Sequence, residues 1–193
     1  MNDRIARLHW LAILIAAIWA VEIVNLATGY RLNQWFGLLP RTAWGLTGVP
    51  LMPLLHGSIA HASANTVPVL IFGLLMQLSA PRRLALVSVL IVIASGLAVW
   101  LFGRSSIHVG ASGLIFGWFG FLIARGYFER TFGSIAIALA VGILYGGFIW
   151  GVLPLHTRIS WEAHLFGALA GIAAAWLFRD EPAGGSPPPA TQQ

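Results

Sequence analysis

Residues 84–103 read LALVSVLIVIASGLAVWLFG, a run of twenty residues without a single charge. A transmembrane α-helix needs about 20 predominantly apolar residues to cross the hydrocarbon core of a bilayer. This run therefore predicts a helix that spans a membrane. The composition of the whole chain agrees, because 58% of its residues are hydrophobic and only 9% are charged, whereas soluble domains usually carry about 25% charged residues.

Five more apolar stretches flank this run, at residues 9–28, 57–80, 111–124, 132–153 and 162–178. Together the six stretches predict an all-α fold, a polytopic bundle of six transmembrane helices that forms one membrane domain over residues 1–179. The loop at 29–56 contains Trp35, Leu38 and Trp44, and such a pattern favours a segment that lies in the membrane interface. Residues 180–193 are rich in proline and glycine, and they predict a disordered tail.

The positive charges indicate how the chain is oriented. All of them are arginines, which stand singly or in pairs between apolar segments, so they mark topology and do not indicate a nucleic-acid partner. Seven fall on one side of the predicted membrane, namely Arg4, Arg7, Arg82, Arg83, Arg125, Arg130 and Arg179. Four fall on the other side, namely Arg31, Arg41, Arg104 and Arg158. This bias predicts a plasma (inner) membrane protein with both termini, and hence the tail, in the cytoplasm.

Polar side chains within the apolar stretches are the candidate functional residues, because such groups are unfavourable in lipid. These are His61, Asn65, Ser112 and His164. At about 1.5 Å per helical residue, Ser112, His164 and Asn65 lie roughly 20, 22 and 24 Å from the cytoplasmic ends of their helices. The hydrocarbon core is about 30 Å thick, so the three residues share one level nearer the outer face.

The stretch that follows Ser112 is too short to span a membrane, because it reaches only to Ala124. We therefore expect protein to surround this helix, with Ser112 at the floor of a polar cavity. Glycines favour close packing of this helix against the stretch at 162–178. Gly113, Gly117 and Gly120 line one side of the first, and Gly167 and Gly171 follow His164 in the second. Small residues let two helix backbones approach closely, which a contact between Ser112 and His164 requires.

A serine and a histidine at one level indicate nucleophilic catalysis. The serine hydroxyl is a weak nucleophile until a neighbouring base takes its proton, and His164 is the natural base for Ser112. The backbone N–H of Ser112, the ring of His61 and the amide of Asn65 are candidate donors to an oxyanion. Glu162 is only two residues from His164 and points elsewhere on the helix, so we expect a Ser-His dyad without a third member.

A metal site is the alternative that the histidines leave open. His56, His61, His108 and His164 could bind a metal ion in a transporter or a metalloenzyme. The chain has no HExxH motif and no paired intramembrane carboxylates, and this interpretation leaves Ser112 without a role. We expect no metal, and we expect His108 to help shape the cavity.

Three motifs resemble those of the rhomboid family. The segment HGSIAHASAN at residues 56–65 resembles the rhomboid HxxxxHxxxN, GASG at 110–113 resembles GxSG, and AHLFGALAG at 163–171 is similar to AHxxGxxxG. The resemblance implies an intramembrane serine endopeptidase that needs no cofactor, acts on transmembrane protein substrates and works within the lipid bilayer. By motif position, Ser112 would be the nucleophile and His164 the base, and His61 and Asn65 would help to form the oxyanion hole. Supporting positions would be Gly110, Gly113, Phe116, Gly167 and Gly171.

The chain also departs from the family pattern. Many rhomboids carry a Trp-Arg pair in the first loop, whereas Trp44 is followed here by Gly45, which leaves the anchoring of this loop open. The aromatic residue four positions after the serine is frequently tyrosine in the family, and here it is Phe116. A catalytically inactive rhomboid-like protein that only binds membrane clients is a further hypothesis. Such proteins usually lose the serine or the histidine, and this chain keeps both.

Overall fold

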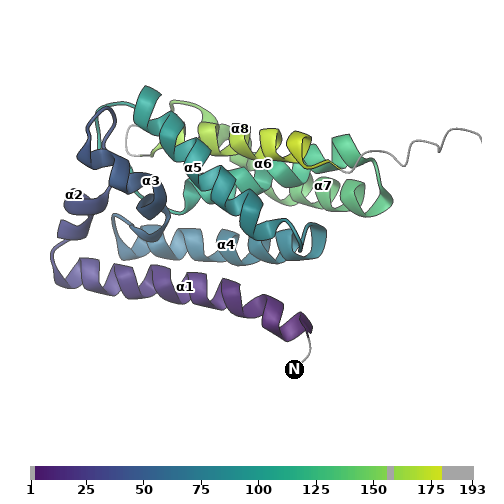
Figure 1. Cartoon of the computed structure of the whole chain (residues 1–193), viewed down its shortest axis with the longest axis horizontal. Helices are drawn as coiled ribbons and strands as arrows, with labels where there is room; N and C mark the ends of the chain where they lie inside the picture. The colour runs from purple at the N-terminus through teal and green to yellow at the C-terminus, as the bar shows by residue number, and fades with distance from the viewer. Residues whose placement is uncertain (1–2, 156–158, 180–193) are drawn as a thin grey trace, which may run out of the picture.

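The computed structural model describes residues 3–155 and 159–179, and the predicted tail at 180–193 lies outside the described residues. Figure 1 shows a bundle of long helices, with α1 along one side next to α4. The long helices are α1 (Asp3–Ala27), α4 (Ile59–Ser79), α5 (Leu84–Phe102), α6 (Ser112–Glu129), α7 (Phe132–Tyr145) and α8 (Trp161–Leu177). Each of the six predicted stretches overlaps one of them, although α1 begins earlier than predicted, at Asp3. The prediction of an all-α bundle is confirmed.

Four segments among the described residues are long and apolar enough to cross a membrane. They are His9–Ala27 of α1, helix α4, helix α5, and α7 continued through the 3₁₀ helix η3 (Gly146–Val152). Helix α6 lies between the others and packs against α4, α5, α7 and α8 (Figure 1). Twelve of its eighteen residues are buried, as expected for a helix that protein surrounds.

The predicted end of α6 at residue 124 is wrong. The helix continues through Arg125 to Glu129. Its charges are satisfied locally, because the Arg125 guanidinium lies 2.6 Å from the Glu129 carboxylate one turn later and donates to the Ser79 hydroxyl at 2.5 Å. The sequence suggested that the charge of Arg125 would end the helix, and it does not.

The loop between α1 and α4 contains four short helices, which are α2 (Arg31–Phe36), η1 (Trp44–Thr47), α3 (Gly48–Leu51) and η2 (Met52–Leu54). Trp35 and Trp44 are exposed, as a segment in the membrane interface requires. Leu38 departs from that expectation, because it is fully buried. Its backbone pairs with that of His108 through two hydrogen bonds of 2.8 and 3.1 Å, which hold the loop against the segment that leads into α6.

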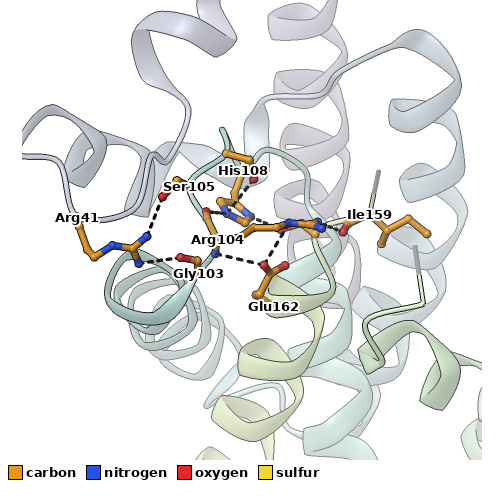
Figure 2. Close-up of polar contacts among 9 residues, drawn as sticks. Arg41, Gly103, Arg104, Ser105, His108, Ile159 and Glu162 are labelled. Atoms are coloured by element: carbon orange, nitrogen blue, oxygen red, sulfur yellow. Dashed lines mark hydrogen bonds and ion pairs between the residues drawn. The ribbon is translucent and has the colours of Figure 1, made fainter. Parts of the chain in front are cut away.

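Two side chains anchor this loop in the absence of a Trp-Arg pair. Arg41 adopts a left-handed backbone conformation with φ 59°. Its guanidinium donates to the Gly103 carbonyl at 2.7 Å and to the Ser105 hydroxyl at 3.0 Å (Figure 2). Trp100 of α5 donates its indole N–H to the Thr42 carbonyl at 2.8 Å. These contacts fasten the loop to the end of α5.

Candidate active site

A cavity of about 860 Å³ lies where α4, α6 and α8 meet the loop before α6. Binding sites for small ligands usually have volumes of about 300–1,000 Å³ and only a few polar groups. This cavity brings together the four candidate residues that the sequence singled out, which are His61, Asn65, Ser112 and His164. Phe116 also lines it, and so does His108, which was expected to help shape the cavity. The motif glycines Gly167 and Gly171 do not line it and face the backbone of α6 instead.

Ser112 is the first residue of α6, after a turn that depends on glycine. Gly110 has φ +124°, and a Cβ atom there would lie 2.8 and 2.9 Å from ring atoms of His61. The next residue, Ala111, donates its backbone N–H to Nε2 of His56 at 3.4 Å. The first N–H groups of an α-helix have no acceptor within the helix, so the backbone N–H of Ser112 is available beside its own hydroxyl.

His164 is held by a backbone carbonyl and by an aromatic ring. Its Nδ1 lies 2.9 Å from the carbonyl oxygen of Gly151 in η3. Because a carbonyl oxygen only accepts, Nδ1 carries the proton and Nε2 carries the lone pair that a general base needs. The ring stacks on Phe116 with 4.1 Å between centroids and 4° between planes. The sequence did not reveal Gly151, because the group that acts is a main-chain atom.

Glycines bring α6 and α8 together as predicted, except that a Cβ atom at Gly117 would come nearest to the side chain of Ile91 in α5 and not to α8. A Cβ atom at Gly167 would collide with the carbonyl oxygen of Gly113, and one at Gly171 would collide with that of Gly117. Among the described residues, no hydrogen bond joins the Ser112 hydroxyl to His164, although both line the cavity. Catalytic hydrogen bonds are often long in enzymes without substrate and shorten when substrate binds.

Two side chains of α4 offer donors on the other side of the cavity. The amide nitrogen of Asn65 is buried without a hydrogen-bond partner among the described residues. His61 accepts the Gly57 N–H on Nδ1 at 3.5 Å, so its Nε2 carries the proton and can donate. A buried donor without a partner is unfavourable in a folded protein, and such groups are often part of a functional site.

The two loop histidines are neutral near pH 7. Burial lowers the pKa of His56 to about 4, and the neighbouring His61 lowers it further in the same direction. Burial also lowers the pKa of His108. Among residues 3–155 and 159–179, no group of three or more histidine, aspartate or glutamate side chains converges in a way that could hold a metal ion.

Glu162 points away from His164, as predicted. Its carboxylate pairs with the Arg104 guanidinium at 3.2 Å and accepts the Arg104 backbone N–H at 3.3 Å (Figure 2). Glu22 accepts a hydrogen bond from the Tyr30 hydroxyl at 3.1 Å, in a different part of the bundle. Neither carboxylate therefore contacts the His164 ring, whose Nδ1 is taken by Gly151.

Known proteins give the context of this site. The Rhomboid domain family matches residues 40–181, and the chain therefore belongs to the rhomboid family of membrane proteins. It is similar to "Uncharacterized protein Rv1337" of Mycobacterium tuberculosis, with 40% identity over 172 residues that cover 84% of this chain and 71% of the relative. It is also similar to "Uncharacterized protein ML1171" of Mycobacterium leprae, with 37% identity over 187 residues that cover 89% and 73%.

Proposed function

We propose that this rhomboid-family protein is an intramembrane serine endopeptidase that cleaves transmembrane or juxtamembrane segments with Ser112 and His164. One observation carries the proposal: a serine at a helix N-terminus, a histidine with a free Nε2 and a buried amide without a partner line one cavity from three different helices. An oxyanion in the cavity would give the buried amide of Asn65 the acceptor that the described residues do not supply.

The chemistry follows from the positions of these groups. Nε2 of His164 takes the hydroxyl proton as the Ser112 oxygen attacks the carbonyl carbon of the scissile peptide bond. The tetrahedral intermediate collapses to an acyl-enzyme while His164 returns the proton to the departing amine. A water molecule, deprotonated by His164, then hydrolyses the ester. The Gly151 carbonyl keeps the imidazole in the tautomer that each step needs, which is the task of the acid in a triad.

The oxyanion is stabilised by groups that are already in place. The backbone N–H of Ser112 and the side chains of His61 and Asn65 donate to it. Removal of one such donor typically lowers kcat by about 10²–10³-fold. The Asn65 amide nitrogen has no hydrogen-bond partner among the described residues, so no protein hydrogen bond has to break before it donates to the oxyanion.

The proposal includes the setting of the reaction. Residues 1–179 form the membrane domain of a plasma (inner) membrane protein, with the termini in the cytoplasm and the cavity open to the extracytoplasmic side. The four spans support a membrane domain, and the arginine bias supports this orientation. A peptide bond reaches Ser112 only in an extended strand, because a helix buries its carbonyls in hydrogen bonds. Substrates therefore carry helix-weakening glycine or proline in the outer half of their membrane segment.

Cleavage of a model transmembrane substrate in liposomes tests the proposal. The wild type should cut in the outer half of the substrate's membrane segment, as mass spectrometry of the products will show. Ser112→Ala and His164→Ala should each reduce cleavage to background while they remain folded and inserted. If either variant retained activity within about tenfold of wild type, the dyad would be wrong, since loss of a nucleophile or base costs far more. Absence of cleavage by folded wild type across such substrates would favour the inactive client binder.

A further inference from the structure

A cluster of charged and polar residues lies beside the cavity, outside the proposed dyad; its members Arg104 and His108 line the cavity. Arg104 and His108 belong to the loop between α5 and α6, and Glu162 belongs to the first turn of α8 (Figure 2). Glu162 has no part in the proposed dyad. Each element lies next to a proposed catalytic residue. The loop leads directly into Ser112, and Glu162 lies two residues before His164.

Arg104 and Glu162 connect the two elements. One carboxylate oxygen of Glu162 forms the ion pair with Nε of Arg104 and also accepts the Arg104 backbone N–H. The other oxygen is buried without a partner among the described residues. The Arg104 guanidinium also donates to the Ile159 carbonyl just ahead of α8. The side chain of Glu162 is 3% exposed and that of Arg104 is 34% exposed. A carboxylate buried to this degree depends on its cationic partner.

His108 adds a second connection between the same two elements. Its Nε2 lies 3.1 Å from the Arg104 carbonyl, which can only accept, so Nε2 carries the proton. Nδ1 then accepts a hydrogen bond from the hydroxyl of Ser160, the residue before α8. His108 is 1% exposed, and its backbone is paired with that of Leu38 in the first loop.

We propose that the Arg104–Glu162 ion pair, supported by His108 and Ser160, sets the position of the His164 end of α8 relative to the Ser112 end of α6. These four are positioning residues, because none of them acts on the reacting atoms. The proposal rests on the proposed protease function for its kinetic consequence, but its structural consequence does not depend on that function. A displacement of about 1 Å between catalytic groups can lower a rate about 10²-fold.

Kinetics give the first test. Glu162 does not line the cavity, so Glu162→Gln should lower kcat about tenfold with little change in KM. Arg104→Gln should be worse, because it leaves a buried carboxylate unpaired. The double variant should recover activity toward that of Glu162→Gln, since the second change removes the unpaired charge. Glu129→Gln is the matched control, because it neutralises the ion pair with Arg125 at the far end of α6.

A disulfide measures the position without any catalysis. The chain has no cysteine. A Cβ atom at Gly113 would lie 3.8 Å from that of Ala163, which matches the mean separation of about 3.8 Å in disulfides. The variant Gly113→Cys/Ala163→Cys should therefore oxidise readily to a cross-link between α6 and α8. Glu162→Gln in this background should slow the oxidation several-fold, and Glu129→Gln should not.

The two measurements separate the proposals. Equal oxidation rates with and without Glu162→Gln would overturn the positioning role, even if the protein is an active protease. Slower oxidation in a protein that shows no Ser112-dependent cleavage would keep the positioning role and reject the proposed function. If Arg104→Gln does not fold, the comparison of Glu162→Gln with Glu129→Gln decides alone, since both replacements keep the side-chain shape.

Discussion

The helix pair that carries Ser112 and His164 and the segment formed by α7 and η3 are packed very differently. Helices α6 and α8 touch backbone to backbone, so that a single methyl group at Gly171 would collide with main-chain atoms of α6. Helix α7 and η3 present most of their side chains outward, and Ile143 is 80% exposed, Leu144 74% and Trp150 65%. A Cβ atom at Gly142 of α7 would find only a side-chain atom of Ile123, at 3.7 Å, whereas one at Gly151 of η3 would lie 2.7 Å from the Phe116 ring.

The comparison shows that the position of His164 is determined from two sides. The glycine contacts with α6 fix the helix that carries it. The orientation of its ring depends on η3, which supplies the Gly151 carbonyl, and on Phe116, which lies between His164 and Phe148 of η3. The first contribution comes from a tightly packed pair, and the second comes from a segment with few buried side chains.

The largest effect is expected where the tight pair is disturbed. Gly171→Ala places a methyl group against the carbonyl of Gly117 and 2.9 Å from the backbone nitrogen of Phe121. Because backbone cannot move aside as a side chain can, we expect a loss of about 3 kcal/mol in stability, visible as a lower Tm in detergent. Gly142→Ala is the matched control and should change Tm little. Equal Tm values for the two variants would mean that the contact between α6 and α8 is looser than described.

A pH-dependent effect is expected just before α6, where His56 accepts the Ala111 N–H. Folded His56 keeps a pKa of about 4, whereas the unfolded residue titrates near 6.5. Between these values the unfolded state binds more protons, so the stability contribution is complete above about pH 6.5 and is lost as the pH falls toward 4. The contribution is on the order of 3 kcal/mol.

The matched variant for this effect is His56→Gln, which keeps an acceptor for the Ala111 N–H and does not titrate. Its Tm should fall less than that of wild type between about pH 6.5 and 4. His108 titrates in both proteins, so some pH dependence remains. Parallel Tm curves would show that His56 is not shielded as the structure indicates.

The smallest effect is expected at the stack that joins the two sides. Phe116→Leu keeps an apolar side chain but loses the stacking on His164, which is worth about 1 kcal/mol. We therefore expect kcat/KM to fall up to about tenfold with an unchanged fold. Phe116→Tyr keeps the ring and should retain most of the activity. Full activity in Phe116→Leu would show that the Gly151 carbonyl alone orients the imidazole.

The sequence predicted the features that depend on residue type. Long apolar runs located the helices, and polar residues within them located the cavity, because lipid makes both patterns unambiguous. The end of α6 was missed because the stretch was ended at its first charge, Arg125. Glu129 stands four residues later, where it can pair with Arg125 within the helix, and Ser79 reaches Arg125 only in the folded bundle. The Gly151 carbonyl and the pair of Arg104 with Glu162 were missed for a related reason: a main-chain atom leaves no pattern, and residues 58 positions apart reveal a contact only in space.

Labelling with a fluorophosphonate probe tests the central claim most directly, because the probe reacts only with a serine that a base has activated. The purified protein in detergent should be labelled at Ser112, as peptide mapping will show. Ser112→Ala should not be labelled, and His164→Ala should be labelled far more slowly. The same rate in His164→Ala as in wild type, or labelling at another residue, would contradict a dyad of Ser112 and His164.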